Sequence, residues 1–498
     1  MEKILVDGKR FVDEYGRHRI FNGVNYSDKC AERVCWLHDE GLMELLIRRF
    51  SQNGWNIIRL GIPWAAIEPK PNEYDEEYID KVVTVMDLCE KYGIYVFIDM
   101  HQDLFSGTAD ARGGDGAPEW ASLRGTKKPR SSKFVWATGY FWDKGVHNCF
   151  DNFWADTRVN GVGLQTYFIN MWCHLVERIK DHPALLGFDL FNEPFPGSDG
   201  GKVFRNLIFN LSRTVITDKR CNKPWLIKQL VTGNSHRVLE PFDDVTLFRK
   251  VTKAGDELVK KFDEGVYSKF INRLSKAIRN VTDKGIIIVE SCYYTNLGIP
   301  FCMPPVNYDG KREKQLCYSP HAYDLMVDTP AYNYASNSRV WSIYEEKKRT
   351  QDEWNVPIIV GEWGAFGPRE SNRWLKHIKF LLSKFDENQW SQTYFTFFPW
   401  LSMNNEYDNL IKTLIRPVPQ AVCGEIQNYK HDRENNLFIL EFVQDKEFDV
   451  PTIIYAHKEI ASIETDGEYE IIPVGKNGES RIEIKTTVGT HKVVIRFK

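Results

Sequence analysis

The chain has 498 residues, of which 42% are hydrophobic, so it can bury one large core with room for a small further domain. Its 65 Lys and Arg against 68 Asp and Glu give a formal charge of -3, which offers no positive field for a polyanion, so we expect no nucleic-acid partner. The ten cysteines form no CxxC pair and no close cysteine and histidine group, which argues against a structural zinc site. We expect most of them to be reduced, with one or two disulfides left open.

The first residues of the sequence do not decide the cellular compartment of the protein. The first residues, Met1 to Asp7, lack the apolar run and small-residue cleavage site of a signal peptide. The protein is therefore expected to be cytoplasmic, or secreted with a signal peptide that is absent from this sequence. No apolar run reaches the length of a bilayer span, so contact with a membrane or micelle surface would be peripheral.

Up to residue 398, short apolar runs alternate with segments whose apolar residues recur every three or four positions, which is typical of βαβ units. Eight strands are predicted, at Arg19 to Asn25, Asn56 to Leu60, Tyr95 to Met100, Leu186 to Phe191, Gly285 to Glu290, Gln315 to His321, Pro357 to Glu362 and Gln392 to Phe398. Helices are predicted between them, at Glu76 to Tyr92, Gly163 to Asp181 and Tyr267 to Asp283 among others. This α/β pattern predicts a TIM-type (β/α)8 barrel over residues 1–418. An open doubly wound sheet is the alternative, disfavoured because no glycine-rich nucleotide loop follows a strand.

From about Gly424 the pattern changes to short alternating strands divided by Asp-Gly and Asn-Gly turn signals. They are predicted at Leu437 to Val443, Thr452 to Ala456, Tyr469 to Pro473, Arg481 to Lys485 and His491 to Phe497. Residues 419–498 are thus expected to form a small antiparallel β-sandwich domain. Covering one flank of the barrel is its simplest role, and lipid or glycan binding is the alternative.

Glu193, in Asn192-Glu193-Pro194, stands two residues after the end of the predicted strand Leu186 to Phe191, and Glu362, in Gly361-Glu362-Trp363-Gly364, ends another predicted strand. Barrel active sites form at this end of the strands, so the two carboxyl groups are expected to face each other. One of them, protonated, can assist a leaving group while the other attacks an anomeric carbon, and a separation of about 5 Å gives retention. The alternative is that each glutamate is only an acidic residue at the N-terminus of a helix, stabilised by the helix dipole. The occurrence of two glutamates at equivalent positions after predicted strands disfavours this alternative.

Further polar and aromatic residues stand in order at the predicted strand ends: Arg59 in Ile57-Ile58-Arg59-Leu60, His101 in Asp99-Met100-His101-Gln102-Asp103, His321 and Tyr323 in Ser319-Pro320-His321-Ala322-Tyr323, and Trp400. With the two glutamate motifs, they make the whole barrel region resemble glycoside hydrolase family five. Taken singly, Arg59 could be a structural ion pair, the histidines satisfied structural residues, and Trp400 a core residue.

The resemblance implies that Glu193 is the acid/base and Glu362 the nucleophile. It also implies that Arg59 orients the nucleophile and that the hydroxyl of Tyr323 touches it. The residues implied to line the sugar subsite are Asn192, His101, His321 and Trp400. No metal and no cofactor are implied.

Within that family the chain is most similar to endoglycoceramidases and related glycosphingolipid and steryl-glucoside hydrolases. The similarity rests on the Asp99 to Asp103 strand end, the opening Phe21 to Asn25, and the junction Ile415 to Val422. It implies that Asp103 and Lys29 bind sugar hydroxyls, although Lys29 departs from the relatives in its spacing after the first strand. The charged, helical segment from Phe242 to Phe262 has no clear counterpart in the bacterial enzymes, which leaves endo-action open.

A glycolipid substrate needs an apolar slot beside the sugar subsites. Two long segments, 104–160 and 297–312, follow predicted strands and are candidates to form it. Their aromatic and apolar residues are Phe134, Trp136, Phe141, Phe301 and Met303. Packing within the loops is the competing explanation for these side chains.

The sequence therefore predicts a retaining β-glycosidase, expected to be monomeric, that cleaves the bond between a glycan and ceramide or a related glycolipid. An exo-β-glucosidase acting on glucosylceramide or steryl glucoside, and a polysaccharide hydrolase of the endo-β-glucanase type, are the alternatives within the enzyme class. A carbohydrate-binding barrel without activity is the alternative outside it. Binding alone would not need an acid, a nucleophile, Arg59 and Tyr323 together.

Overall fold

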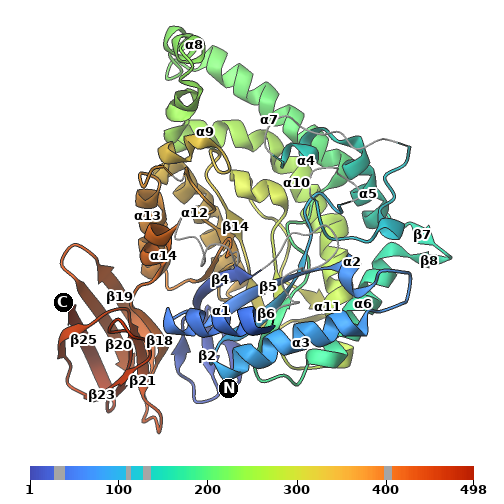
Figure 1. Ribbon diagram of the computed structural model, residues 1–498. Coiled ribbons are helices and arrows are strands. Elements are labelled where there is room, and N and C mark those ends of the chain that lie inside the picture. The colour runs from blue at the N-terminus through green and yellow to red at the C-terminus, as the bar shows by residue number, and fades with distance from the viewer. Residues whose placement is uncertain (27–39, 108–113, 127–135, 369, 398–406) are drawn as a thin grey trace.

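The computed structural model describes residues 1–26, 40–107, 114–126, 136–368, 370–397 and 407–498. A barrel of strands ringed by helices forms most of the molecule, and a second, all-strand body lies beside it at the C-terminus (Figure 1). No helix among the described residues is long and apolar enough to cross a membrane.

The barrel contains all eight predicted strands, and every pair of neighbours in the sheet runs parallel. In sheet order they are β13 (Leu316–Tyr318), β10 (Ile286–Val289), β9 (Leu185–Asp189), β6 (Tyr95–His101), β5 (Ile57–Pro63), β4 (Asn22–Tyr26), β17 (Ser391–Tyr394) and β15 (Ile359–Val360). A parallel bridge between Tyr318 and Ile358 joins the two outer strands. The predicted (β/α)8 barrel is confirmed, and the open sheet is excluded.

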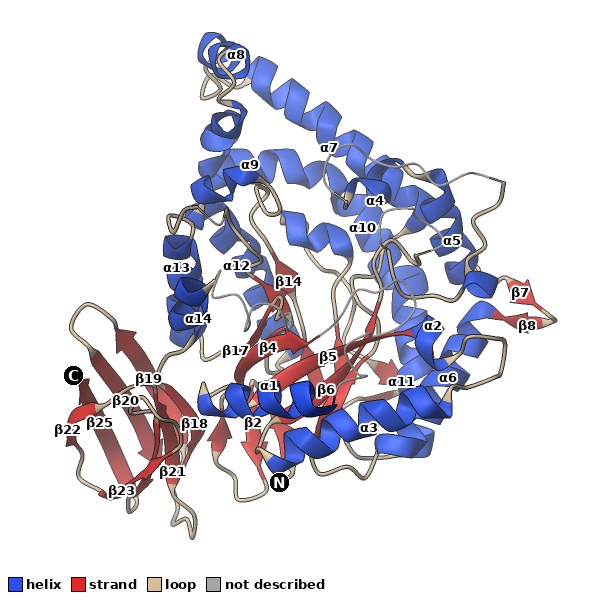
Figure 2. Ribbon diagram, in the orientation of Figure 1, coloured by secondary structure: helices blue, strands red, loops and turns tan. Residues whose placement is uncertain are grey.

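Helices cover the barrel because each turns an apolar stripe toward the strands. Asp75 caps one of them, since its side chain accepts a hydrogen bond from the backbone of Tyr78. The covering helices are α1 (Glu40–Gln52), α2 (Trp64–Ile67), α3 (Glu76–Lys91), α6 (Leu164–Ile179), α11 (Ser268–Val281), α12 (Asn337–Trp354), α13 (Leu375–Glu387) and α14 (Asp408–Leu414). The three helices predicted explicitly match α3, α6 and α11 (Figure 2).

Two long insertions stand on the carboxyl-terminal side of the strands. The first, between β6 and β9, contains α4 (Thr138–Trp142), α5 (Lys144–Trp154) and the hairpin of β7 (Arg158–Val159) and β8 (Val162–Gly163). The second, between β9 and β10, contains α7 (Gly197–Thr217), α8 (Lys223–Val231), α9 (Val245–Thr252) and α10 (Asp256–Phe262). The predicted charged helical segment from Phe242 to Phe262 is α9 and α10. The loop after β10 and the segments after β13 and β15 add β11 (Asn307–Tyr308), β12 (Lys311–Arg312), β14 (His321–Ala322) and β16 (Glu362–Trp363).

The C-terminal body is the predicted antiparallel β-sandwich. One sheet contains β18 (Val418–Val422), β21 (Thr452–Ala456), β24 (Ser480–Lys485) and β23 (Glu468–Pro473), and the other contains β19 (Glu425–Asp432), β20 (Leu437–Gln444), β25 (Gly489–Phe497) and β22 (Ile460–Glu464). Ile454 and Ile482 of the first sheet share one buried core with Phe438 and Leu440 of the second. Alternate residues of these strands face that core, which explains their period of two.

The start of the chain contributes strands that the sequence analysis did not predict. The strands β1 (Ile4–Asp7), β2 (Arg10–Asp13) and β3 (His18–Arg19) extend the first sheet of the sandwich through the pairing of β3 with β18. Ile4 and Phe11 also pack with Ile57 and Tyr95, the first residues of two barrel strands. The N-terminal strands thus close the amino-terminal end of the barrel and bind it to the sandwich, so this sheet crosses the predicted boundary at residue 418.

We expect the close approach of β4 and β5 to be sensitive to one added methyl group. A Cβ at Gly23 would lie 1.8 Å from the carbonyl oxygen of Ile57, so Gly23→Ala must push two barrel strands apart. The free energy of unfolding should fall by about 3 kcal/mol, measured by urea denaturation. The control is Gly93→Ala, where φ is +70 and no atom lies within 4 Å, so only about 1 kcal/mol of backbone strain is expected. Equal losses in the two variants would contradict the close approach.

Candidate active site

Glu193 and Glu362 meet at the carboxyl-terminal end of the barrel. Glu193 follows β9, and Glu362 begins β16, which pairs in parallel with β14 so that His321 lies beside Glu362. One carboxylate oxygen of each glutamate and a ring nitrogen of His321 lie within 4.8 Å of one another. Both glutamates are only 5% exposed, so the two carboxyl groups face each other in a shielded space. This separation is the one that a double displacement with retention requires.

Arg59 of β5 lies fully buried below the two glutamates. Its guanidinium forms ion pairs with the carboxylates of Asp99 at 2.9 Å, Asp189 at 2.9 Å, Glu290 at 2.5 Å and Glu362 at 2.8 Å. Burial alone would lower the pKa of Arg59, but these carboxylates raise it well above its usual value, so the side chain stays charged.

Burial and mutual repulsion also shift the pKa values of the carboxyl groups around Arg59. Burial raises the pKa of Asp189 to about 7, with Arg59 opposing the rise and Asp99 adding to it. Burial, together with the nearby Asp189, also raises the pKa of Glu290 well above its usual range. One guanidinium cannot balance four buried negative charges, so this cluster holds protons near neutral pH.

Two donors orient the carboxylate of Glu362. Nη1 of Arg59 donates to Oε1 at 2.8 Å, and the hydroxyl of Tyr323 donates to Oε2 at 2.9 Å. Burial, with Glu362 and Glu193 nearby, raises the pKa of Tyr323 well above its usual value, so the phenol keeps the proton that it donates. The sequence prediction that Arg59 and Tyr323 contact Glu362 agrees with these distances.

Glu193 is held by its backbone as well as by its side chain. Its φ of 40° is in the left-handed region, which is uncommon for a residue other than glycine, and its backbone N–H donates to Oε2 of Glu290 at 2.8 Å. Its Oε1 accepts a hydrogen bond from Nδ2 of Asn296 at 2.6 Å and lies 3.0 Å from Nδ1 of His321. Burial lowers the pKa of His321 to about 3, so its ring is neutral beside the two glutamates.

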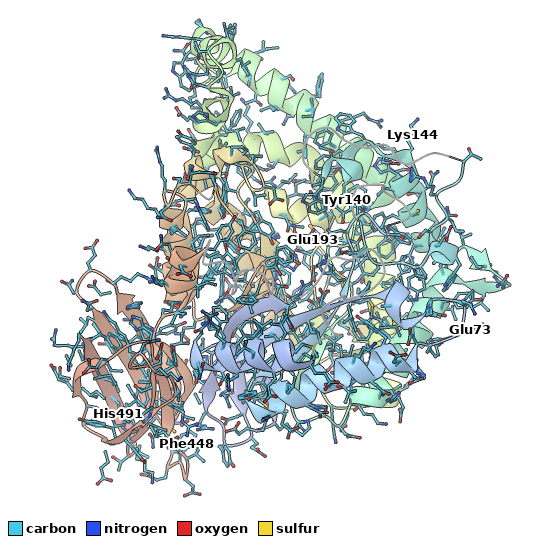
Figure 3. All side chains as sticks on the ribbon, viewed as in Figure 1. Glu73, Tyr140, Lys144, Glu193, Phe448 and His491 are labelled. Atoms are coloured by element: carbon cyan, nitrogen blue, oxygen red, sulfur yellow. The ribbon has the colours of Figure 1, made fainter. Side chains whose placement is uncertain are left out.

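Two further predicted site residues, Asn192 and His101, lie near Glu193 and Glu362. Asn192 accepts a hydrogen bond from Arg59 at 2.8 Å, which fixes its amide beside the cluster. His101 has Nδ1 2.7 Å from Asp99 and Nε2 3.6 Å from Asp103. Burial would lower the pKa of His101, but Asp99 and Asp115 raise it well above its usual value. The side-chain amide of Gln102, at the same strand end, donates to the backbone carbonyl of Glu193 and to the hydroxyl of Tyr140, two residues labelled in Figure 3.

A cavity of about 560 Å³ opens beside the two glutamates. Polar side chains that line it include Asp103, Glu193, Asn296, Tyr323 and Glu362. The apolar part of its wall contains Trp136, Phe141, Phe204, Leu297, Leu325, Val327 and Phe366, and Asp324 and Asp328 also line the cavity. The predicted contribution of Trp136 and Phe141 to an apolar slot therefore agrees with the cavity.

Two other predicted slot residues do not line the cavity. Phe301 and Met303 are 3% exposed, and Phe301 stacks on Tyr318 and contacts Trp354 below the loop. The backbone carbonyl of Met303 accepts a hydrogen bond from the ring N–H of Trp354, so packing against the barrel explains both residues, as the alternative supposed. Phe134 lies outside the described residues.

Lys29 and Trp400 also lie outside the described residues, so their predicted roles stay predictions. The aromatic ring that follows β17 directly and lines the cavity is Phe395, which stacks on His101 with ring centroids 6.5 Å apart. The sequence analysis also missed Asn296 and Tyr293, which lie in the 3-10 helix Tyr293–Leu297 after β10 and line the cavity. The strand predicted at Gln392 to Phe398 runs beyond the observed end of β17 at Tyr394, so Phe395 fell inside the predicted strand and not at its end.

The cysteine prediction can be judged for eight of the ten. Those in the described residues are all free thiols: Cys89, Cys149, Cys173, Cys221, Cys292, Cys302, Cys317 and Cys423. Burial raises the pKa of Cys292, which lies beside the site and is therefore a neutral, packed thiol.

Comparisons with known proteins converge on one family. A family model described as cellulase, glycosyl hydrolase family 5, matches residues 12–227 and 243–399. Endoglycoceramidase I of Rhodococcus hoagii (strain 103S) is 32% identical over 216 residues, which span 42% of this chain and only 41% of that protein. The endoglycoceramidase of Cyanea nozakii is 28% identical over 484 residues, or 91% of this chain and 83% of that protein. The solved structure of endo-glycoceramidase II from Rhodococcus sp. has the same fold, with a TM-score of 0.72 over 98% of this chain and 99% of that chain at 21% identity.

We expect the buried cluster to require the guanidinium geometry and not only its charge. In Arg59→Lys, a compact ammonium group cannot reach all four carboxylates, so the free energy of unfolding should fall by about 3 kcal/mol at neutral pH. Near pH 5 the loss should be smaller, because Asp189, with a raised pKa of about 7, takes up a proton and less negative charge needs balancing.

The matched control is Arg178→Lys, in a surface ion pair with Asp80 that should change stability by less than about 0.5 kcal/mol. Urea denaturation at both pH values measures the effects. A loss in Arg59→Lys no larger than in the control would show that the cluster does not depend on Arg59.

Proposed function

Because the chain belongs to glycosyl hydrolase family 5, we propose that it hydrolyses the β-glycosidic bond of a glycolipid with retention of configuration. The observation that carries this proposal is the approach of Glu193 and Glu362 to within 4.8 Å in a cavity whose lining is mostly apolar. The carboxyl pair fits the glycosidic bond, and the apolar wall fits a lipid aglycone.

In the proposed first step, an oxygen of Glu362 attacks the anomeric carbon as the bond to the leaving oxygen breaks. Glu193, protonated, gives its proton to that oxygen, so the lipid leaves as an alcohol and the sugar is bonded to Glu362. In the second step Glu193, now ionised, takes a proton from water, and the hydroxide oxygen displaces Glu362. Two inversions give net retention, and both carboxyl groups return to their starting states.

The neighbouring residues receive positioning and binding roles. Arg59 and Tyr323 hold both oxygens of Glu362, so its attacking geometry is set before the substrate arrives. Asn296 and the neutral ring of His321 hold Oε1 of Glu193. Asp103, which lines the cavity, receives the role of hydrogen-bonding sugar hydroxyls, together with His101 beside it and with Asn192.

The relatives support a ceramide-linked substrate, since three matched proteins are named endoglycoceramidase and the matched protein of Rhizopus delemar is named glucosylceramidase. We propose that the bond between the glycan and the lipid is the one cleaved. A lipid substrate also brings the protein to a membrane or micelle surface.

The first test separates the two carboxyl roles. Glu362→Ala should lower kcat on an aryl β-glycoside by at least about 10⁵-fold, because no covalent intermediate can form. With azide added, Glu362→Ala should form a glycosyl azide of inverted configuration, since the anion fits the space of the lost carboxylate. Glu193→Gln should lose several orders of magnitude on glycolipid but less on an aryl glycoside, whose leaving group needs no proton. Near-normal turnover of glycolipid in either variant would contradict the assignment of Glu362 as nucleophile and Glu193 as acid/base.

The second test identifies the bond. Glucosylceramide, lactosylceramide, a ganglioside, steryl glucoside and a soluble β-glucan are offered separately, and the products are identified by mass spectrometry. Release of an intact oligosaccharide from the ganglioside is the expected result for endo-action. Release of glucose alone from glucosylceramide or steryl glucoside would mean an exo-glucosidase, and cleavage of the β-glucan alone would support a polysaccharide hydrolase.

A further inference from the structure

A helical arm projects from the barrel beside the cavity. It consists of residues 202–234, which are most of α7, the turn after it, and α8. In Figure 1, α8 and the adjoining end of α7 extend beyond the rest of the molecule.

The arm turns large apolar side chains toward solvent. On α7 the side chains of Val203, Leu207 and Thr214 are buried and hold the helix to the body of the protein. Phe209 and Ile216, seven residues apart on another face, are 72% and 63% exposed. Three further exposed residues lie on α8, namely Ile227, Leu230 and Val231, the last 82% exposed. So many large apolar groups in water on one element mark a surface that contacts something apolar.

The charge of the arm is opposite to that of the chain. The arm has seven Lys and Arg but a single acid, Asp218, in a protein whose formal charge is -3. Arg220 pairs with Asp218 and Asp244, and Lys202 pairs with Asp199. The other five form no ion pair with any described carboxylate: Arg205, Arg213, Lys219, Lys223 and Lys228. Exposed apolar groups next to unneutralised positive charge are the combination found in helices that lie on anionic bilayers.

The arm is continuous with the apolar wall of the cavity. Phe204 of α7 lines the cavity and stacks on Phe141 with ring centroids 4.2 Å apart. On its other side the ring of Trp142, 57% exposed, meets Phe204 edge-on at 4.8 Å. An apolar path therefore runs from the cavity past Phe204 and Trp142 to the surface next to the arm.

We infer that the α7–α8 arm docks the protein on a bilayer that contains anionic phospholipid, with its apolar side chains at the acyl boundary and its lysines and arginines at the phosphates. The docked arm holds the apolar side of the cavity toward the bilayer, so a lipid-linked sugar reaches the two glutamates without its lipid crossing water. This inference deepens the proposed function and rests on it for the identity of the substrate, while the docking itself needs no turnover.

Vesicle binding tests the docking alone. The full chain is sedimented with vesicles of phosphatidylcholine and phosphatidylserine in equal parts, and with vesicles of phosphatidylcholine alone, both without glycolipid. We expect binding to the anionic vesicles that weakens in high salt. The variant Phe209→Ser/Ile216→Ser/Val231→Ser and the variant Lys219→Gln/Lys223→Gln/Lys228→Gln should each bind them more weakly, the second on the order of 100-fold.

The matched control removes exposed apolar groups from the β-sandwich instead. Tyr469→Ser/Ile471→Ser/Val488→Ser changes three exposed side chains far from the arm in sequence and should bind vesicles as the wild type does. Unchanged vesicle binding in both arm variants, or equal loss in the control, would overturn the inference. A dimer of the wild type would also overturn it, if light scattering shows that the arm variants are monomers and the wild type does not bind vesicles. The arm would then cover a second copy of the chain.

A second readout separates docking from function. Hydrolysis of a soluble aryl β-glycoside should be the same in the wild type and both arm variants, whereas hydrolysis of glycolipid in anionic vesicles should fall at least tenfold in the variants. If the wild type binds vesicles but cleaves no glycolipid, the proposed substrate is wrong and the docking stands. If glycolipid in vesicles is cleaved equally by all three proteins, the docking inference is wrong and the proposed function stands.

Discussion

One buried arginine joins the ends of four barrel strands. Arg59 comes from β5, and its ion-pair partners Asp99, Asp189, Glu290 and Glu362 come from β6, from β9, from the end of β10 and from β16. A positive charge without these partners would be costly in the barrel, and so would the carboxylates without it. The strand ends are therefore held in one arrangement, which is the arrangement that sets the two facing glutamates.

The same network fixes the site in two ways. Arg59 bonds directly to Glu362, and through Glu290 it reaches the backbone of Glu193, whose left-handed φ needs such support. Both carboxyl groups are thus positioned by Arg59 and Glu290, which are buried and do not line the cavity. The protons that the cluster holds limit its net charge, so the network binds the strands without adding four full negative charges to the cavity.

The barrel strands and the two glutamates could be predicted from the sequence because the patterns that indicate them are local. A parallel barrel strand is buried on both faces and appears as a short apolar run, so all eight were found, and Glu193 and Glu362 were visible as the first acids after two of them. Contacts between distant segments leave no local sequence pattern. The pairing of β3 with β18 joins residues about 400 positions apart, and no sequence feature near His18 indicates it. Phe395 was missed because the eighth strand was predicted to continue to Phe398, whereas β17 ends at Tyr394.

The central claim is that Glu362 forms a covalent bond to the sugar while Arg59 and Tyr323 hold it. A 2-deoxy-2-fluoro β-glycoside with a good leaving group slows both steps but the second more, so the intermediate accumulates and can be mapped by peptide mass spectrometry. The account predicts one sugar per chain, on the peptide that contains Glu362. A sugar on Glu193 or Glu290, or steady turnover of an aryl glycoside with no labelled peptide, would contradict it.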